Sequence, residues 1–477
     1  MSTPEIIRAM VSLAPPQPST ANKREVTPSF GQSPSQAQPS VTEPVGQGGE
    51  KNTRYTRHVL LPYDLRDRNI ILAKDEVQAL LCTIFPKTEN VSEPRYRSHL
   101  VFQVDELPPP PRPLTVGGLP ITFVGNNIDN DGLLFPRQTL SNYKISVCAD
   151  VDVATLTGQR LRDLAARVNL EIIKNLPGIR VVELIFTAAR TFYVVLADNV
   201  NIRSILSKAP GRIVKCPTGY VNVKDLHRPA WANLPARKQI DPSPITGVVD
   251  DTAYDTVRPG VMIGSEIPKE HGRPNIFSTT AGVLVKNNEN DVFMTVASHG
   301  VGRQIWQPHR PERIIGEPMV EIPFTDITLM RLRPDVRFTN ETFASSGGVV
   351  PRFKGLITPN DPVKFEPIHL NSPFAGHMEG NVVMHSVKIP EMPSGSTDNL
   401  KEVSEKYVLC HWHFMGQGDG SSPTIAPPDG TCGSVLWNDD GIVVGFYQYA
   451  IRTGEWAGFS AAVRACEVVA SGCTLAV

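Results

Sequence analysis

The chain has 477 residues, of which 40% are apolar and 20% are charged, the balance of a globular protein. This length allows two or three domains, each with a core of its own. Lys and Arg number 47 against 48 Asp and Glu, so the formal net charge is -1. Such a balance provides no positive field that would collect nucleic acid or an anionic membrane, and it argues against both as partners.

The first residues, the apolar runs and the cysteines indicate in which cellular compartment the protein is expected. Residues 1–20 lack the basic start and long apolar core of a secretory signal, and no apolar run reaches the about 18 residues of a membrane span. The seven cysteines are scattered and form no CxxC pair, which favours reduced thiols over a disulfide framework or a zinc site. We therefore expect a cytoplasmic or nuclear protein without a membrane contact, a metal or another cofactor.

Composition divides the first third of the chain into two parts. Residues 1–55 are rich in Pro, Ser, Gln, Thr and Gly and poor in large apolar side chains, which predicts a disordered tail. Residues 56–139 are ambiguous, with helical spacing at 73–85 and then the proline run Pro108–Pro113. A run of this kind adopts polyproline II, and it is either a stiff spacer or a ligand for a protein partner with an aromatic groove.

Residues 140–227 alternate between strand and helix periods. Strand patterns at 143–149, 179–186, 191–196 and 213–223 are interleaved with helix patterns at 155–176 and 202–207. Their order matches a ferredoxin-like plan, so we predict a small α+β domain. RNA-recognition modules share this plan, but their aromatic strand signature and a basic cluster are both missing. A docking or scaffold domain for a protein partner is the favoured interpretation.

The remainder of the chain changes character at about residue 269. Residues 228–268 contain six prolines and little periodicity, which predicts a linker. From 269 to 477, short apolar strands recur between Gly, Pro and Asn turns, which predicts an all-β sandwich or a pair of barrels. The sequence as a whole therefore indicates a multidomain protein.

Three short segments of this β-rich region carry residues suited to nucleophilic catalysis. They are FMTVASHG at 293–300, TDITLMRL at 325–332 and DGTCGSVL at 429–436. A thiol that attacks an amide must lose its proton, and a histidine within hydrogen-bond reach can take it. An acidic group on the other ring nitrogen fixes the tautomer of that histidine. Glycines beside the nucleophile let backbone N–H groups face a developing oxyanion.

In this order, the segments resemble the three signature blocks of the chymotrypsin-like peptidase superfamily. The residues TVASH, DITLM and GTCGS are similar to its T-A-A-H, D-I-A-L-L and G-D-S-G-G blocks, with cysteine at the nucleophile position as in the chymotrypsin-like cysteine peptidases of RNA viruses. The resemblance covers the last half of the chain and implies an all-β double barrel there. It implies that Cys432 is the nucleophile, His299 the general base and Asp326 the orienting group.

The resemblance also implies contacts with a peptide or protein substrate. The amides of Gly430 and Cys432, with Gly433 nearby, are expected to form the oxyanion hole. The strand at 443–450 resembles the one that lines the substrate cleft of the family, so contacts with the peptide backbone are expected from Phe446, Tyr447 and Gln448.

Departures from the family pattern leave an alternative open. Cys432 stands in place of serine, Thr431 in place of the preceding aspartate, and Gly300 where secreted members place a disulfide cysteine. We expect a cysteine endopeptidase that works through an acyl-enzyme, and the alternative is an inactive peptidase fold used as a binding or scaffold module. Ser434 is a rival nucleophile, and the run Cys410–His413 is better explained as part of a buried strand than as a metal site.

Overall fold

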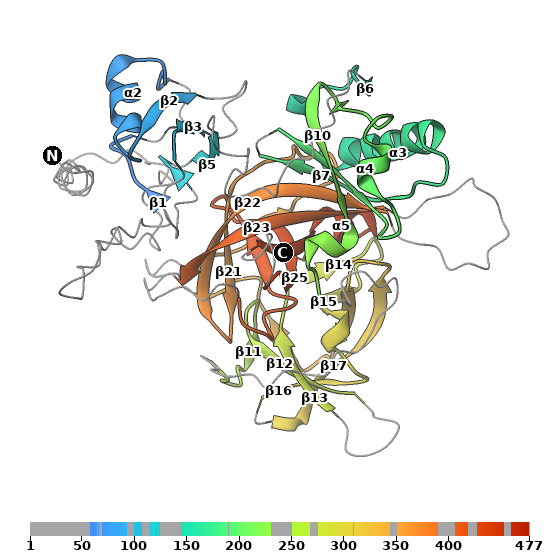
Figure 1. Ribbon diagram of the computed structural model, residues 1–477. Helices are drawn as coiled ribbons and strands as arrows, with labels where there is room; N and C mark the ends of the chain where they lie inside the picture. The colour runs from blue at the N-terminus through green and yellow to red at the C-terminus, as the bar shows by residue number, and fades with distance from the viewer. Residues whose placement is uncertain are drawn as a thin grey trace, which may run out of the picture. The chain divides into compact units, whose positions relative to one another are not determined.

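A computed structural model (Figure 1) describes residues 58–63, 65, 69–92, 100–106, 115–117, 119–124, 145–188, 190–229, 250–267, 275–308, 310–343, 351–389, 406–417, 427–452 and 459–476. The predicted disordered tail and the proline run Pro108–Pro113 lie outside these residues. The described part is mostly β-structure and forms two compact units, Met1–Gln138 with Gly418–Ser421 and Thr139–Gln417 with Ser422–Val477. None of its helices is both long and apolar enough to cross a membrane.

The first unit has a core of its own, although its sequence pattern is ambiguous. Its five-stranded sheet has the order β1 (His58–Val59), β4 (Thr115–Val116), β5 (Leu119–Val124), β3 (Leu100–Val104) and β2 (Thr88–Ser92), and its helix is α2 (Asp75–Cys82). Phe85 packs edge-on against both Phe102 and Phe123, with ring centroids 4.9 Å apart in each pair. Residues 56–139 therefore contain a small packed domain.

An eight-stranded sheet, called barrel 1 below, wraps around one core in the second unit. Its order is β13 (Asn275–Thr280), β12 (Met262–Ile267), β16 (Ile305–Gln307), β17 (Arg310–Ile322), β18 (Ile327–Leu332), β15 (Val292–Ala297), β14 (Leu284–Lys286) and β27 (Thr474–Leu475). Buried Ile263, Met294, Ile315 and Met330, from four of these strands, meet in that core. The short strands β11 (Thr256–Val257) and β19 (Arg337–Phe338) pair separately.

Strand β12 corrects the last part of the predicted linker at 228–268, whose residues 230–249 lie outside the described residues. It pairs with β13 along its whole length and with β16 on the other side, so it is an inner strand of barrel 1. The prolines that suggested a linker, Pro259 and Pro268, flank this strand and do not interrupt it. Proline lacks the N–H that a strand interior needs, so it is placed at strand ends, and here it marks the limits of a strand.

Six strands close into a second barrel, barrel 2. Around the ring they are β21 (Pro367–Ser372), β24 (Val435–Trp437), β25 (Ile442–Ala450), β26 (Phe459–Arg464), β23 (Tyr407–Gln417) and β22 (Gly376–Lys388), and β22 pairs again with β21. Strand β20 (Gly355–Leu356) pairs with β25, and helix α5 (Cys466–Ala470) follows β26. Because the ring is closed, each of its strands has a partner on both sides. Strand β22 also pairs with a strand outside the ring.

The predicted α+β domain at 140–227 is an extension of barrel 2. Its strands are β7 (Val181–Thr187), β8 (Phe192–Leu196), β10 (Cys216–Asn222), β9 (Arg212–Ile213) and β6 (Ser146–Val147), and its helical segments are η2 (Val153–Thr155), α3 (Gly158–Asn175), α4 (Ile202–Ile205) and η3 (Val223–Leu226). Strand β7 pairs with β22 from Glu183 opposite Lys388 to Thr187 opposite Met384, so one sheet runs through both regions. A separate ferredoxin-like domain is therefore not what the structure has.

The burial of these strands explains why they share one sheet with barrel 2. The side chains of β8 are all buried, as are those of β7 except at Val182, so neither strand has a face for solvent. Strands of this kind need cover on both faces. Helix α3 contributes Leu161, Leu164, Val168 and Ile172 to the common core, and it lies next to β7 (Figure 1).

Candidate active site

The ends of two paired strands bring His299 and Asp326 together. Strands β15 and β18 are antiparallel, with Ala297 opposite Ile327. The residue after β15 therefore lies opposite the residue before β18, and the N–H of Ser298 donates to the carbonyl of Asp326 at 2.9 Å. His299 follows in a single turn, η5 (Ser298–Gly300), which points its ring back towards Asp326.

Two hydrogen bonds join Asp326 to His299. Oδ1 of Asp326 accepts from the backbone N–H of His299 at 2.9 Å, and Oδ2 lies 2.6 Å from Nδ1 of the ring. The side chains are only 12% and 15% exposed. Asp326 has φ 58, a left-handed conformation that aspartate tolerates better than most residues. Because Nδ1 faces the carboxylate, Nε2 is the ring nitrogen that remains for a reacting group.

The charges around His299 favour its protonated form. Burial lowers the pKa of the ring, but the charges of Asp326 and Cys432, with side-chain hydrogen bonds to both residues, raise it well above its usual range. The effect of Cys432 on this pKa indicates that its sulfur lies near the imidazole. An imidazolium beside a sulfur stabilises the thiolate, which is the nucleophilic form of cysteine.

Cys432 lies in a tight turn that only glycines can flank. Gly430 has φ 88 and Gly433 has φ 85, both in the left-handed region. A Cβ on Gly430 would meet the ring of Phe374 at 2.5 Å, and one on Gly433 would meet the carbonyl oxygen of Thr280 at 2.8 Å. The turn therefore packs too closely for side chains, and it presents a half-buried thiol that donates to the carbonyl of Gln448 at 3.1 Å.

Two backbone N–H groups beside the thiol are open. Among the described residues, no hydrogen-bond partner is found for the N–H of Gly430 or of Cys432. The N–H of Gly433 donates to the carbonyl of Tyr447 at 2.9 Å, so this third candidate for the oxyanion hole is already occupied. Gly433 therefore helps to fix the turn against β25.

The three predicted substrate contacts are all buried, and all three line one cavity at the site. Phe446 is buried and pairs with Val435 and Val463, and Tyr447 is buried with its backbone bonded to Ser434 and Gly433. The pairing of β25 with β26 shifts register between Tyr447 and Tyr449, which leaves Gln448 outside the ladder. A bulge of this kind frees the backbone of one residue, and here that residue faces Cys432.

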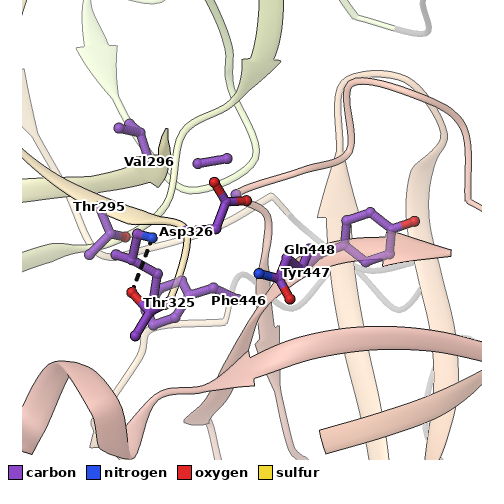
Figure 2. A pocket seen from close by; sticks show the side chains of 10 residues that line it. Thr295, Val296, Thr325, Asp326, Phe446, Tyr447 and Gln448 are labelled. Carbon is purple, nitrogen blue, oxygen red and sulfur yellow. Dashed lines mark hydrogen bonds between the residues drawn. The ribbon is translucent and has the colours of Figure 1, made fainter. Parts of the chain in front are cut away.

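A narrow cavity marks where the two barrels meet. Thr295 and Ala297 of β15, with Thr325 and Asp326 before β18, line it from barrel 1, and β25 lines it from barrel 2. Figure 2 shows Asp326 and Gln448 among the side chains around this cavity. The His299–Asp326 pair and the Cys432 turn are therefore contributed by different barrels.

The alternative nucleophile and the alternative metal-binding run do not lie at the candidate active site. Ser434 is completely buried below the turn, so it cannot reach a substrate. Cys410 belongs to the core of barrel 2, whereas the ring of His411 lies 2.9 Å from Oγ of Ser386 and 3.6 Å from Glu183. Within the described residues, no group of three or more His, Cys, Asp and Glu side chains is arranged to hold a metal ion.

Two further residues of the site belong to none of the sequence motifs. Thr279 and Thr280, at the end of β13, contact the backbone of the Cys432 turn. They belong to the ordinary strand sequence NIFSTT, and nothing in its pattern distinguishes them from other strand threonines. Only the fold brings them to the turn, since about 150 residues separate the partners in the chain.

Comparison with solved structures finds bacterial proteases among the similar chains. A protease from Nocardiopsis is 13% identical, with 46% of this chain and 100% of that chain covered and a TM-score of 0.30. A chymotrypsin from Cellulomonas bogoriensis is 14% identical, with 46% and 98% covered and a TM-score of 0.30. A glutamic-acid-specific serine protease is 12% identical, with 46% and 100% covered and a TM-score of 0.31.

These values are too low to assign an activity to this chain. No family model matches its sequence. No curated protein matches it either. The chemistry of the site must therefore be argued from its own residues.

Proposed function

We propose that this protein is a cysteine peptidase of chymotrypsin-like fold, which hydrolyses peptide bonds through an acyl-enzyme on Cys432. The observation that carries the proposal is the setting of His299, whose Nδ1 lies 2.6 Å from Asp326 and whose pKa is raised by Asp326 and by nearby Cys432. Two barrels that share the site, and the chain order His, Asp, Cys, agree with that fold.

The geometry supports a complete catalytic cycle. The sulfur of Cys432 adds to the scissile carbonyl, and the new oxyanion accepts from the N–H groups of Gly430 and Cys432. His299 then gives its Nε2 proton to the amine as the C–N bond breaks, which leaves a thioester. Water adds to the thioester while His299 takes its proton, and the C–S bond breaks to release the acid. Asp326 holds the ring in the required tautomer throughout.

The half-buried environment suits a thiolate–imidazolium pair. The pKa of His299 is raised well above its usual range, because the pull of Asp326 and Cys432 outweighs the effect of burial. A raised pKa favours the protonated ring, which is suited to act as an acid towards the leaving amine. Cysteine in place of serine is consistent with this arrangement, since a thiolate needs less help from a base than a hydroxyl does.

Peptide-library hydrolysis by the full chain tests the proposal. Cys432→Ala should abolish cleavage, whereas Cys82→Ala, which removes the other cysteine that is not buried, should leave it unchanged. Retained cleavage in Cys432→Ala would assign the activity to another residue. Absence of cleavage and of thioester formation in the wild-type chain would favour the alternative of an inactive peptidase fold that serves in binding.

A further inference from the structure

We propose that Thr279 and Thr280 of barrel 1 are positioning residues for the oxyanion hole of barrel 2. Their role is to hold the turn Gly430–Cys432, called the oxyanion turn below, in the conformation that exposes its N–H groups. This inference rests on the proposed function, because it assigns to two further residues a part in the same reaction.

Three hydrogen bonds join the two threonines to the oxyanion turn. The hydroxyl of Thr279 donates to the carbonyl of Cys432 at 2.5 Å, and the backbone N–H of Thr280 donates to the same carbonyl at 3.2 Å. The hydroxyl of Thr280 donates to the carbonyl of Gly430 at 3.0 Å. The threonines are 3% and 0% exposed, so water does not compete for these bonds.

The N–H of Ser434 donates to the carbonyl of Thr431 at 3.0 Å within the turn, but the backbone at Gly430 is permissive and needs further support. Glycine occupies several backbone conformations at similar energy, so the peptide groups around Gly430 can rotate and carry their N–H groups away from the thiol. Each peptide group is planar, and a fixed carbonyl therefore fixes the orientation of the plane that contains it. Bonds to the carbonyls of Gly430 and Cys432 fix the peptide planes 430–431 and 432–433. These two planes flank the plane that carries the N–H of Cys432, and the first also adjoins the plane that carries the N–H of Gly430.

The position of β13 explains why these threonines can reach the turn. Among the described strands, β13 lies at the end of the barrel 1 sheet and pairs with β12 alone. Thr280, its last residue, directs its N–H towards Cys432, and a Cβ on Gly433 would meet its carbonyl at 2.8 Å. The side chain of threonine is stiff because it is branched at Cβ, so a hydroxyl on a strand is a fixed donor. The oxyanion turn thus rests on a rigid edge of the other barrel.

Two reactions at the same sulfur separate this role from a general structural one. Acylation of Cys432 by p-nitrophenyl acetate passes through an oxyanion, which collapses to a thioester as p-nitrophenolate leaves. Alkylation by iodoacetamide forms a C–S bond and releases iodide, and no oxyanion arises. Misplaced donors should therefore slow acylation and leave alkylation unchanged. Both rates are measured on the full chain, with the Cys432→Ala background subtracted for acylation and the Cys432 peptide followed by mass spectrometry for alkylation.

Thr280→Val should lower the acylation rate by about 10 to 100-fold, since loss of a whole oxyanion donor costs about 100 to 1,000-fold and displacement of one costs less. Thr279→Val should act in the same direction, and Thr280→Ser should restore most of the rate. Thr342→Val is the matched control, because it also removes a buried hydroxyl that donates to a backbone carbonyl. That carbonyl belongs to Pro259, and the hydrogen bond is 3.1 Å long. It should leave the ratio of acylation to alkylation unchanged.

The outcomes separate this inference from the proposed function. If the wild-type chain acylates Cys432 and Thr280→Val and Thr279→Val keep its rate, the positioning role is refuted and the peptidase proposal stands. Equal losses of acylation and alkylation also refute the role, because they indicate general damage to the site. If the wild-type chain forms no thioester, the proposed function fails, and the inference fails with it.

Discussion

The clearest consequence of the structure concerns Asp326→Asn, because the orientation of the new amide is fixed by the backbone. The N–H of His299 donates to Oδ1 of Asp326, so an asparagine must keep its oxygen at that position. Its NH₂ group then faces Nδ1 of the ring, where Oδ2 now lies at 2.6 Å. Nδ1 must accept a hydrogen bond, and the proton of neutral His299 moves to Nε2. Nε2 can then no longer take a proton from the thiol or from water.

The expected loss is large. The wrong tautomer lowers turnover in a Ser-His-Asp triad by about 10,000-fold, and we expect about 1,000 to 10,000-fold here, or about 4 to 5.5 kcal/mol of activation free energy. The variant keeps the bond from the His299 backbone to Oδ1, so the fold of the site should survive. Thioester formation with p-nitrophenyl acetate measures the loss, and urea unfolding checks the fold. A loss below about tenfold in a folded variant would contradict the orienting role of Asp326.

Four further predictions follow from the contacts described above. Gly430→Ala should lose thioester formation, and adding Phe374→Leu should not restore it, because relief of the 2.5 Å contact leaves φ 88 strained; recovery in the double variant would refute the role of φ. The alkaline limb of activity should lie above the usual range of histidine and move down in Asp326→Asn, because the pKa of His299 is raised mainly by Asp326 and Cys432 against burial. Protonation of this residue should accordingly stabilise the fold below the pKa of the unfolded chain, with that stability lost as pH rises through the folded pKa, and a pH series of urea unfolding checks the sign. Arg228→Met should destabilise the second unit by about 3 to 5 kcal/mol in urea unfolding, because it leaves buried Glu183 without its bidentate partner, and adding Glu183→Gln should recover part of the loss.

The sequence allowed the catalytic candidates to be predicted because their signal is local. Each of His299, Asp326 and Cys432 belongs to a short block in which glycines or strand residues surround one reactive group. The structure brings the side chains of His299 and Asp326 together, and the turn glycines have the positive φ values that their setting indicated. Residue types at fixed local spacing are the kind of information that a single sequence carries well.

The contacts between distant segments could not be predicted in this way. The support from Thr279 and Thr280 depends on pairings across 153 and 150 residues, and no strand pattern specifies them. The same limit hid the pairing of β7 with β22, which makes one sheet of two predicted domains. The register shift beside Gln448 is also a tertiary feature, because a bulge is set by the partner strand as well as by the sequence of its own.

This shared sheet gives residues 145–229 a direct connection to the site. The sheet runs from Gln448 in β25 through β26, β23 and β22, in that order, to Glu183 in β7 outside the barrel. At the far end, the buried carboxylate of Glu183 accepts two bonds from Arg228, and His411 of β23 lies 3.6 Å away. Burial raises the pKa of Glu183, but Arg228 and His411 outweigh it and hold the pKa well below its usual range. The region is therefore part of the framework of barrel 2.

The most direct test of the account is to find where an acyl group is attached. The full chain is mixed with p-nitrophenyl acetate, quenched rapidly in acid, digested and mapped by mass spectrometry. The account predicts one acetyl thioester, on Cys432, that forms in the wild-type chain and is lost in His299→Ala. An acetyl group on Ser434 or another residue, or a Cys432 thioester that forms as fast without His299, would contradict it.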